Sequence, residues 1–157
     1  MDMPRITDAH RRLEALAGTW AGEETLQPSP WAPEGSTVFG RLEARIDLDG
    51  FFLITNYVGE KADRSAVVYR GHGVYGWDEK KQRYTMNWFD SMGGEYETPA
   101  LGTWEGDTLL FVQRGLHFQN RFTYEMQGPD AYRFSIENST DGETWKLFME
   151  AVYRRQP

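Results

Sequence analysis

Polar side chains that share a predicted sheet face with aromatic residues are the candidates for chemistry in this chain. A buried polar group without a hydrogen-bond partner costs about 1–3 kcal/mol. Such residues therefore either satisfy one another, together with buried water, or meet a ligand. The inward polar residues are predicted to be Thr55, Tyr57, Asp90, Asn120 and Asn138, with Trp88 and Trp145 beside some of them.

Asp90 is the acidic member of this set and lies in the segment WFDSMGG, Trp88 to Gly94. A serine and two glycines follow it closely, so Asp90 can close an Asx turn at a strand end. Alternatively, it is a polar anchor at the mouth of a barrel. An isomerase or hydrolase could use the same side chain as an acid or base.

Signatures of familiar catalytic and metal sites are missing. The chain has no cysteine, which excludes disulfides, thiolate metal sites and cysteine nucleophiles. It has no G-x-S-x-G elbow, phosphate loop or dinucleotide fingerprint, and no spacing that brings three or four zinc ligands together. Glu23 and Glu24 fall on opposite faces of a strand and do not form an acid–base pair. We therefore predict no catalytic residue, metal or cofactor, and favour a binding protein over an enzyme.

The three histidines do not change this prediction. His10, on a helix, and His117, on a polar strand face, are expected at the surface. His72 stands in the segment GHG, whose glycines would let a flat cofactor such as haem approach. The strand register, however, places His72 on the face opposite Trp88 and so away from an interior that contains Trp88.

Composition limits the class of protein. The 157 residues fit one domain, residues 1–157, and the formal net charge of -7 argues against nucleic acid as a partner. No apolar run approaches the length of a membrane helix, and no signal-peptide pattern is present, so a cytoplasmic protein is expected. Aromatic residues make up 15% of the chain and 16 glycines accompany them, which is typical of an aromatic-lined β fold.

The elements that must position these residues begin with one helix, predicted over residues 8–17. Thr7 or Asp8 can cap it, and Leu13 and Leu16 are spaced to share one apolar face. A glycine then ends it. So short a helix is expected to plug or flank the strands that follow.

Successive hairpin signals cover the rest of the chain, residues 18–155, and the clearest are Asp49-Gly50 and Asp141-Gly142. A long up-and-down antiparallel sheet avoids exposed edges most simply by closing. We therefore predict a closed antiparallel up-and-down β-barrel of about ten strands.

The turns also predict which residues face each other and point inward. Around Asp49-Gly50 the inward pairs are Leu48 with Phe51, Ile46 with Leu53, Ala44 with Thr55, and Leu42 with Tyr57. Around Asp141-Gly142 they are Asn138 with Trp145, Ile136 with Leu147, Phe134 with Met149, and Tyr132 with Ala151. A turn at residues 79–82 pairs Trp77 with Tyr84, Tyr75 with Met86, Gly73 with Trp88, and Gly71 with Asp90, so two glycines leave room for Trp88.

One irregular stretch, residues 27–35, carries three prolines around Trp31. Prolines forbid a central strand there. The stretch is either a stiff surface loop or a lid whose Trp31 covers the mouth of the barrel.

The segment GTWAGEE, Gly18 to Glu24, follows the helix and opens the first strand. It resembles the G-x-W signature of calycins, the group of lipocalins, fatty-acid-binding proteins and nitrobindins. That resemblance implies that Trp20 closes the barrel base and packs on an arginine of the last strand, Arg154 or Arg155, with Arg155 favoured by its parity with Tyr153. The proximal histidine of nitrobindins has no counterpart after His117, which argues against haem.

A second resemblance covers nearly the whole chain. GTW, LDGFF, GHGVYGWD, YTMNWFDSMGG and the closing YRR are similar to the bacterial "domain of unknown function fifteen seventy-nine". The resemblance implies a lipocalin-like barrel and no established activity.

The preferred hypothesis is a protein that binds a small apolar or amphipathic molecule inside the barrel. Tyr57, Trp88 and Trp145 would form its walls, Asp90, Asn120 and Asn138 would orient a polar end, and Trp31 would lie in the lid. The alternatives are a solidly packed structural or interaction barrel and an enzyme that uses Asp90. A cavity of roughly 300 Å³ or more would favour binding over packing. Either a monomer or a homodimer fits the sequence.

Overall fold

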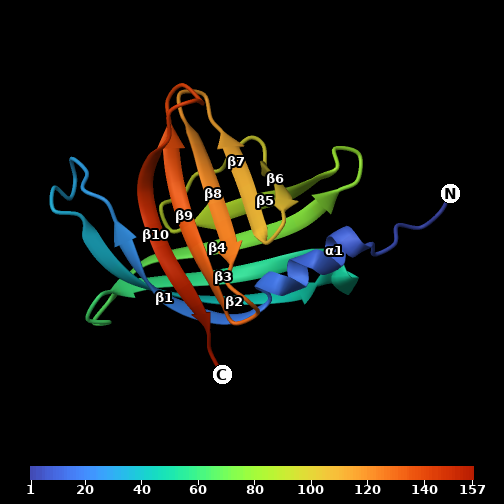
Figure 1. Cartoon of the computed structure of the whole chain (residues 1–157), viewed down its shortest axis with the longest axis horizontal. Coiled ribbons are helices and arrows are strands. Elements are labelled where there is room, and N and C mark those ends of the chain that lie inside the picture. The colour runs from blue at the N-terminus through green and yellow to red at the C-terminus, as the bar shows by residue number, and fades with distance from the viewer.

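Ten antiparallel strands follow one another around a closed barrel in the computed structural model, which describes residues 1–157 (Figure 1). The strands are β1 (Gly18–Leu26), β2 (Ser36–Asp47), β3 (Phe52–Lys61), β4 (Val67–Asp78), β5 (Arg83–Asp90), β6 (Ala100–Glu105), β7 (Thr108–Arg114), β8 (Gln119–Met126), β9 (Ala131–Ser139) and β10 (Lys146–Arg155). Each strand pairs with its sequence neighbours, and β1 pairs with β10. Because every strand has a paired neighbour on both sides, the predicted closed up-and-down barrel is confirmed.

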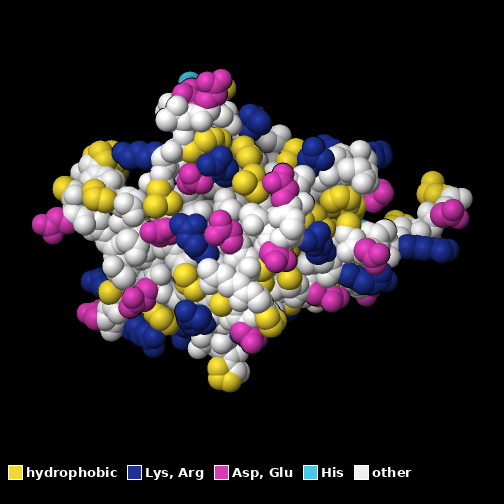
Figure 2. Space-filling model, in the orientation of Figure 1, with side chains coloured by type: hydrophobic (Ala, Val, Ile, Leu, Met, Phe, Trp, Pro, Cys, Tyr) yellow, Lys and Arg dark blue, Asp and Glu magenta, His cyan; other side chains and the backbone are white.

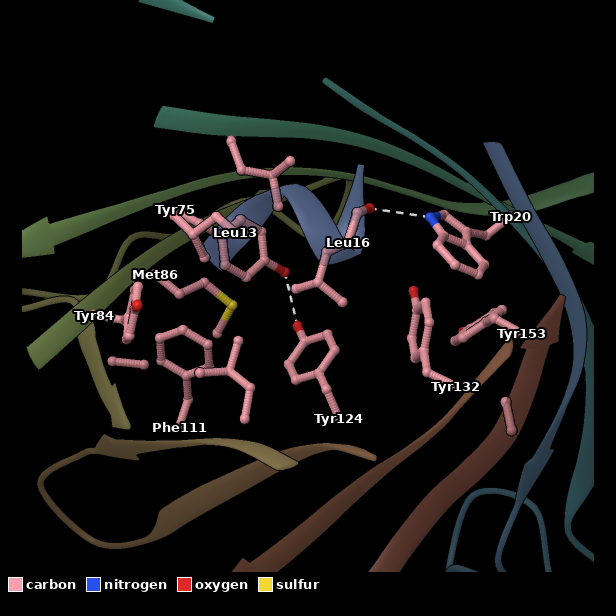
Figure 3. Close-up of a cluster of buried hydrophobic side chains, with 14 of the residues drawn as sticks. Leu13, Leu16, Trp20, Tyr75, Tyr84, Met86, Phe111, Tyr124, Tyr132 and Tyr153 are labelled. Carbon is pink, nitrogen blue, oxygen red and sulfur yellow. Dashed lines mark hydrogen bonds between the residues drawn. The ribbon is translucent and has the colours of Figure 1, made fainter. Parts of the chain in front are cut away.

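A helical segment closes one end of the barrel. It consists of α1 (Asp8–Arg12) and a 3-10 turn, η1 (Leu13–Leu16), and Thr7 is the N-cap. Leu13 and Leu16 are buried in the core cluster, and the Tyr84 hydroxyl of β5 donates a 2.7 Å hydrogen bond to the Ala9 carbonyl. Figure 3 shows the two leucines among the aromatic side chains of the strands. The predicted plug is therefore confirmed, although its last turn is 3-10.

His10 differs from the prediction that it lies at the surface, because it is only 8% exposed. Its ring Nδ1 accepts a 3.0 Å hydrogen bond from the Thr7 N–H, and the ring packs edge-on against Phe51 at 5.2 Å between centroids. Burial lowers the pKa of His10 below its ordinary value. The helix-capping role and the β2–β3 turn beneath the ring explain why the side chain turns inward.

Trp20 lies at the base of the barrel, as its resemblance to the calycin tryptophan predicts. The side chain is fully buried, and its Nε1 donates a 3.0 Å hydrogen bond to the Leu16 carbonyl (Figure 3). The Arg155 guanidinium lies 4.3 Å from the centre of the indole and donates to the Ala17 carbonyl at 2.8 Å. A cation over an indole face is attracted by its quadrupole, so Arg155, rather than Arg154, locks the helical segment to the last strand.

Two of the three predicted registers described above hold along the strands. Between β2 and β3, Ile46 pairs with Leu53, Ala44 with Thr55 and Leu42 with Tyr57. Between β4 and β5, all four predicted pairs are present. The exception is Leu48, which is 59% exposed instead of buried. It lies in the 3-10 turn η2 (Leu48–Gly50), where Leu48 and Asp49 have positive φ and leave the strand alternation.

The predicted register of the last hairpin is wrong. Asn138 pairs with Lys146 rather than Trp145, and Tyr132 pairs with Tyr153 rather than Ala151. The Asp141 carboxylate accepts hydrogen bonds from the N–H groups of residues 143 and 144, which lengthens the loop and lowers the pKa of Asp141 to about 2. A bulge between Leu147 and Met149 then breaks the side-chain alternation that the prediction assumed.

Charged side chains of both signs cover the outer faces of the strands, as Figure 2 shows for one side of the molecule. An example is Glu150 of β10, which forms a 2.6 Å ion pair with Arg133 of β9. None of the helices is both long and apolar enough to cross a membrane. The polar exterior leaves the barrel interior as the place where apolar and aromatic side chains gather.

Candidate functional site

A cavity of about 560 Å³ occupies the barrel interior beyond the core that packs on the helical segment. Val68, Tyr96 and Phe148 line it and are also exposed, so the cavity opens to solvent near these residues. Of its 23 lining residues, 18 are hydrophobic. Seven of the eight tyrosines of the chain belong to this lining.

Five of the seven sequence-predicted site residues line this cavity. They are Tyr57 on β3, Trp88 and Asp90 on β5, Asn120 on β8 and Asn138 on β9. The strand registers explain the grouping, because Asn120 lies directly opposite Asn138 and Trp88 lies opposite Gly73. Neither asparagine amide has a hydrogen-bond partner within the protein.

Trp145 and Trp31 lie outside the cavity lining. Trp145 precedes β10, beyond the bulge, and Arg121 lies 4.4 Å over its ring on the outer face of the barrel. Trp31 is 87% exposed in the loop between β1 and β2. Residues 27–35 therefore form a surface loop, and Trp31 does not cover the mouth of the barrel. His72 points away from the cavity, as predicted, and its Nδ1 lies 2.8 Å from Asn56 Oδ1.

A buried carboxylate, Glu24 of β1, lies in the cavity wall and is the main feature that the sequence predictions missed. It is 4% exposed. The Tyr57 hydroxyl donates to both of its oxygens, at 2.6 and 2.8 Å, and the Tyr153 hydroxyl donates to Oε2. Gly40 on β2 provides the room, because a Cβ at that position would lie 2.1 Å from Glu24 Oε2. Residues of three other strands, β2, β3 and β10, are thus adapted to one acidic side chain of β1.

Burial dominates the electrostatics of this cluster. It raises the pKa of Glu24 above the ordinary value of 4.5, and the hydrogen bonds from Tyr153 and Tyr57 offset part of that rise. Burial and the adjacent Glu24 raise the pKa values of the Tyr57 and Tyr153 phenols as well, so both hydroxyls remain protonated donors. The cluster therefore presents a carboxyl group held by two neutral hydroxyls.

A second group of hydrogen-bonded polar side chains lies on β4 and β5. The Trp88 indole N–H donates to the Tyr69 hydroxyl at 3.1 Å, and that hydroxyl donates to Asp90 Oδ2 at 2.6 Å. The other carboxylate oxygen of Asp90 accepts the Met92 N–H at 3.0 Å, which is the Asx turn that the sequence suggested. Gly71 lets the indole lie flat on the strand, because a Cβ there would lie 2.0 Å from Trp88 Cζ2.

The closed end of the cavity is formed by tyrosines. The hydroxyls of Tyr75 and Tyr124 lie 2.7 Å apart (Figure 3). Tyr132 is 3% exposed, and no hydrogen bond satisfies its hydroxyl. Tyr132 is one of the residues that line the cavity, so its phenol belongs to the polar groups at this end.

The alternation of side chains along a strand could have predicted that Glu24 and Tyr69 face inward. Counting from Trp20, which faces inward, every second residue of β1 leads to Glu24. Counting back from Gly71 in β4 leads to Tyr69 in the same way. The sequence prediction placed Glu23 and Glu24 on opposite strand faces, but it did not identify Glu24 as the inward one.

The polar groups of the cavity lining are carboxyl, phenol and amide groups, which can hydrogen-bond and carry charge. The lining contains no serine, threonine, cysteine, lysine or histidine, so Ser–His and Cys–His nucleophile–base pairs are not present there. The structure brings no three His, Cys, Asp or Glu side chains close enough to hold a metal ion. The arrangement can hold a molecule through hydrogen bonds, ring stacking and charge.

Solved structures with the same fold include three barrels. Rv2717c from M. tuberculosis has a TM-score of 0.69 and 13% identity, over 98% of this chain and 100% of that one. The S-type phycobiliprotein lyase CPES from Guillardia theta has a TM-score of 0.64 and 10% identity, over 98% and 99%. EF1p2_mFAP2b bound to DFHBI has a TM-score of 0.51 and 13% identity, over 94% and 98%. At these identities the likeness shows the fold alone.

Sequence comparison gives one family. The model of the family described as "Protein of unknown function (DUF1579)" matches residues 5–155. Among curated proteins, no sequence matches the chain.

Proposed function

The chain belongs to this family of unknown function, and from the cavity in its barrel we propose that it binds a small, largely apolar molecule with one polar end. The cavity volume of about 560 Å³ is the observation that carries the proposal. It exceeds the roughly 300 Å³ at the lower end of small-molecule sites. A solidly packed barrel would hold only isolated waters, so this volume favours binding over the packed alternative.

The residues with a binding role are those whose polar atoms or ring faces reach the cavity. Tyr57 and Trp88 would supply flat apolar walls, and their rings lie 6.2 Å apart. Asn120 and Asn138 would orient a polar group, since their amides have no partner in the protein. The occurrence of DFHBI in one barrel of similar fold supports the idea that such an interior can hold a flat organic molecule.

An enzyme that uses Asp90 is the weaker alternative. Both carboxylate oxygens of Asp90 already accept hydrogen bonds, from Tyr69 and from the Met92 N–H. These contacts support a structural and anchoring role. A cytoplasmic location, and the choice between a monomer and a homodimer, stay predictions.

Filling the cavity tests the proposal. Ile136 lines the cavity on β9, whereas Ile54 lies on β3 outside the cavity lining, and both are half-buried isoleucines. With the neutral fluorescent lipophile N-phenylnaphthylamine, we expect saturable binding to the wild type and to Ile54→Trp, and at least a tenfold weaker affinity for Ile136→Trp. Native mass spectrometry of the purified protein would reveal a retained ligand. Absence of saturable binding, together with a ligand-free native mass, would refute the proposal.

A further inference from the structure

The charges that line the cavity are of one sign. Glu24 and Asp90 are its two ionisable carboxylates, and no lysine, arginine or histidine is among the lining residues. The arginines of the barrel strands that form ion pairs, such as Arg121 and Arg133, do so with outer-face carboxylates. A molecule entering the cavity therefore meets negative potential without a compensating cation.

Glu24 retains the capacity to accept a further hydrogen bond. A carboxylate offers about four lone-pair directions. The two tyrosine hydroxyls beside Glu24 supply two protons, and the ion pairs of the structure do not include Glu24. A buried ionised carboxyl without a paired cation is costly, so a positively charged occupant would be stabilised there.

Tyr132 lies next to this cluster. It lines the cavity from β9, is 3% exposed and forms no side-chain hydrogen bond. Its ring lies 5.4 Å from the ring of Tyr153, which itself donates to Glu24. A further aromatic ring therefore stands beside the carboxyl cluster.

An aromatic wall separates the two carboxylates. The Tyr57 ring lies 5.7 Å from that of Tyr69 and 6.2 Å from that of Trp88, while the hydroxyl of Tyr57 reaches Glu24 and that of Tyr69 reaches Asp90. Electron-rich ring faces attract cations and repel anions. The aromatic walls and the two carboxylates therefore both favour a positively charged ligand.

We propose that the ligand of this cavity is an amphipathic amine: an aliphatic or aromatic body that carries an ammonium group, which is held by Glu24. This inference rests on the proposed function and specifies its ligand class. Anionic amphiphiles such as fatty acids are disfavoured, since their carboxylate would lie beside Glu24 with no cation to pair with it.

The binding should depend on pH through Glu24. The groups that face it are the phenols of Tyr57 on β3 and Tyr153 on β10, with Tyr132 on β9 nearby, and these phenols stay neutral over the range of interest because burial raises their pKa values. Burial also raises the pKa of Glu24, so protons compete with the ammonium for it. Affinity for the amine should therefore increase as pH rises through the raised pKa of Glu24 and then level off.

Three ligands that share one alkyl chain test the inference on the wild-type protein: decylamine, decanol and decanoate. At pH 8 the amine is charged as an ammonium, since alkylamines have pKa values near 10.4. Isothermal titration calorimetry should give roughly tenfold tighter binding of decylamine than of decanol, the fold-change expected for one cation–π or charge-assisted contact. Decanoate should bind more weakly than decanol.

Glu24→Gln is the informative variant, because glutamine keeps the shape and can hydrogen-bond to both tyrosines. Its matched control is Glu150→Gln, which removes the same charge from the outer face of β10. We expect Glu24→Gln to lose the preference for decylamine and its pH dependence while retaining decanol binding, and Glu150→Gln to keep both.

The outcomes separate the two proposals. Decanol binding without a preference for decylamine would overturn the inference and leave the proposed function standing. Equal or tighter binding of decanoate, or an intact amine preference in Glu24→Gln, would also overturn it. Failure of all three ligands to bind would count against the proposed function itself.

Discussion

Replacing Glu24 with glutamine should make the barrel more stable at neutral and alkaline pH. The native environment raises the pKa of Glu24 because the carboxyl is 4% exposed and has no cation beside it. In the unfolded chain the same group titrates near 4.5. The native state therefore binds the proton more tightly than the unfolded state does.

The sign and size of the effect follow from proton linkage. Where the native state binds more protons, the free energy of unfolding falls as pH rises. The contribution of Glu24 is therefore fully present below pH 4.5 and is lost as pH rises through its raised native pKa, by about 1.4 kcal/mol for each unit of the rise. Glutamine has no such titration, so Glu24→Gln should match the wild type at low pH and exceed its stability at pH 8.

A leucine at the same position separates hydrogen bonding from charge. Glu24→Leu leaves the hydroxyls of Tyr57 and Tyr153 without their acceptor. Each stranded hydroxyl costs about 1–3 kcal/mol, so this variant should be less stable than Glu24→Gln by roughly 2–6 kcal/mol at every pH.

Urea denaturation followed by tryptophan fluorescence, at pH values from 4.5 to 8.5, measures these quantities. His10 titrates in the same range with the opposite sign, since burial lowers its pKa and its contribution is lost as pH falls. Subtracting the Glu24→Gln curve from the wild-type curve removes the His10 contribution. Parallel curves for the two proteins would show that Glu24 does not titrate differently on folding, and would refute the reasoning.

Two further predictions concern the cavity walls. Gly71→Ala should lower the free energy of unfolding by about 1–3 kcal/mol in urea titrations, because its new Cβ would lie 2.0 Å from Trp88 Cζ2. Adding Trp88→Phe to this variant should recover much of that loss. A Gly71→Ala variant as stable as the wild type would contradict the close packing of Gly71 and Trp88. Tyr75→Phe should lower the free energy of unfolding by about 1–3 kcal/mol, because the Tyr124 hydroxyl loses its partner at 2.7 Å. Changing both tyrosines to phenylalanine should lower it less than either single change, since no hydroxyl is then left without a partner. Additive losses in a double-mutant cycle would contradict this prediction.

Much of the fold could be predicted from the sequence because hairpin turns are local. The turn at residues 79–82 gave the whole β4–β5 register, including the two glycines that face Trp88 and Asp90. The Asp49-Gly50 turn did the same for β2 and β3. A short connection restricts the pairing of its two strands, so alternation then decides which side chains face inward.

Prediction failed where an interaction outside the regular ladder changed the count. The Asp141 carboxylate caps its own loop and, with the bulge at Leu147, moves Trp145 to the outer face. His10 is buried because the β2–β3 turn, distant in sequence, brings Phe51 against its ring. Neither effect is visible in the strand pattern of a single hairpin.

The sequence by itself determined a closed meander of about ten strands, an N-terminal plug and an aromatic interior, because turns, strand parity and the G-x-W segment act over short stretches of chain. Only the tertiary structure decided that the interior is hollow, and that Glu24 of the first strand meets Tyr57 of the third and Tyr153 of the last. The volume left between side chains depends on how all ten strands close. The cluster around Glu24 exists because closure brings the first and last strands side by side.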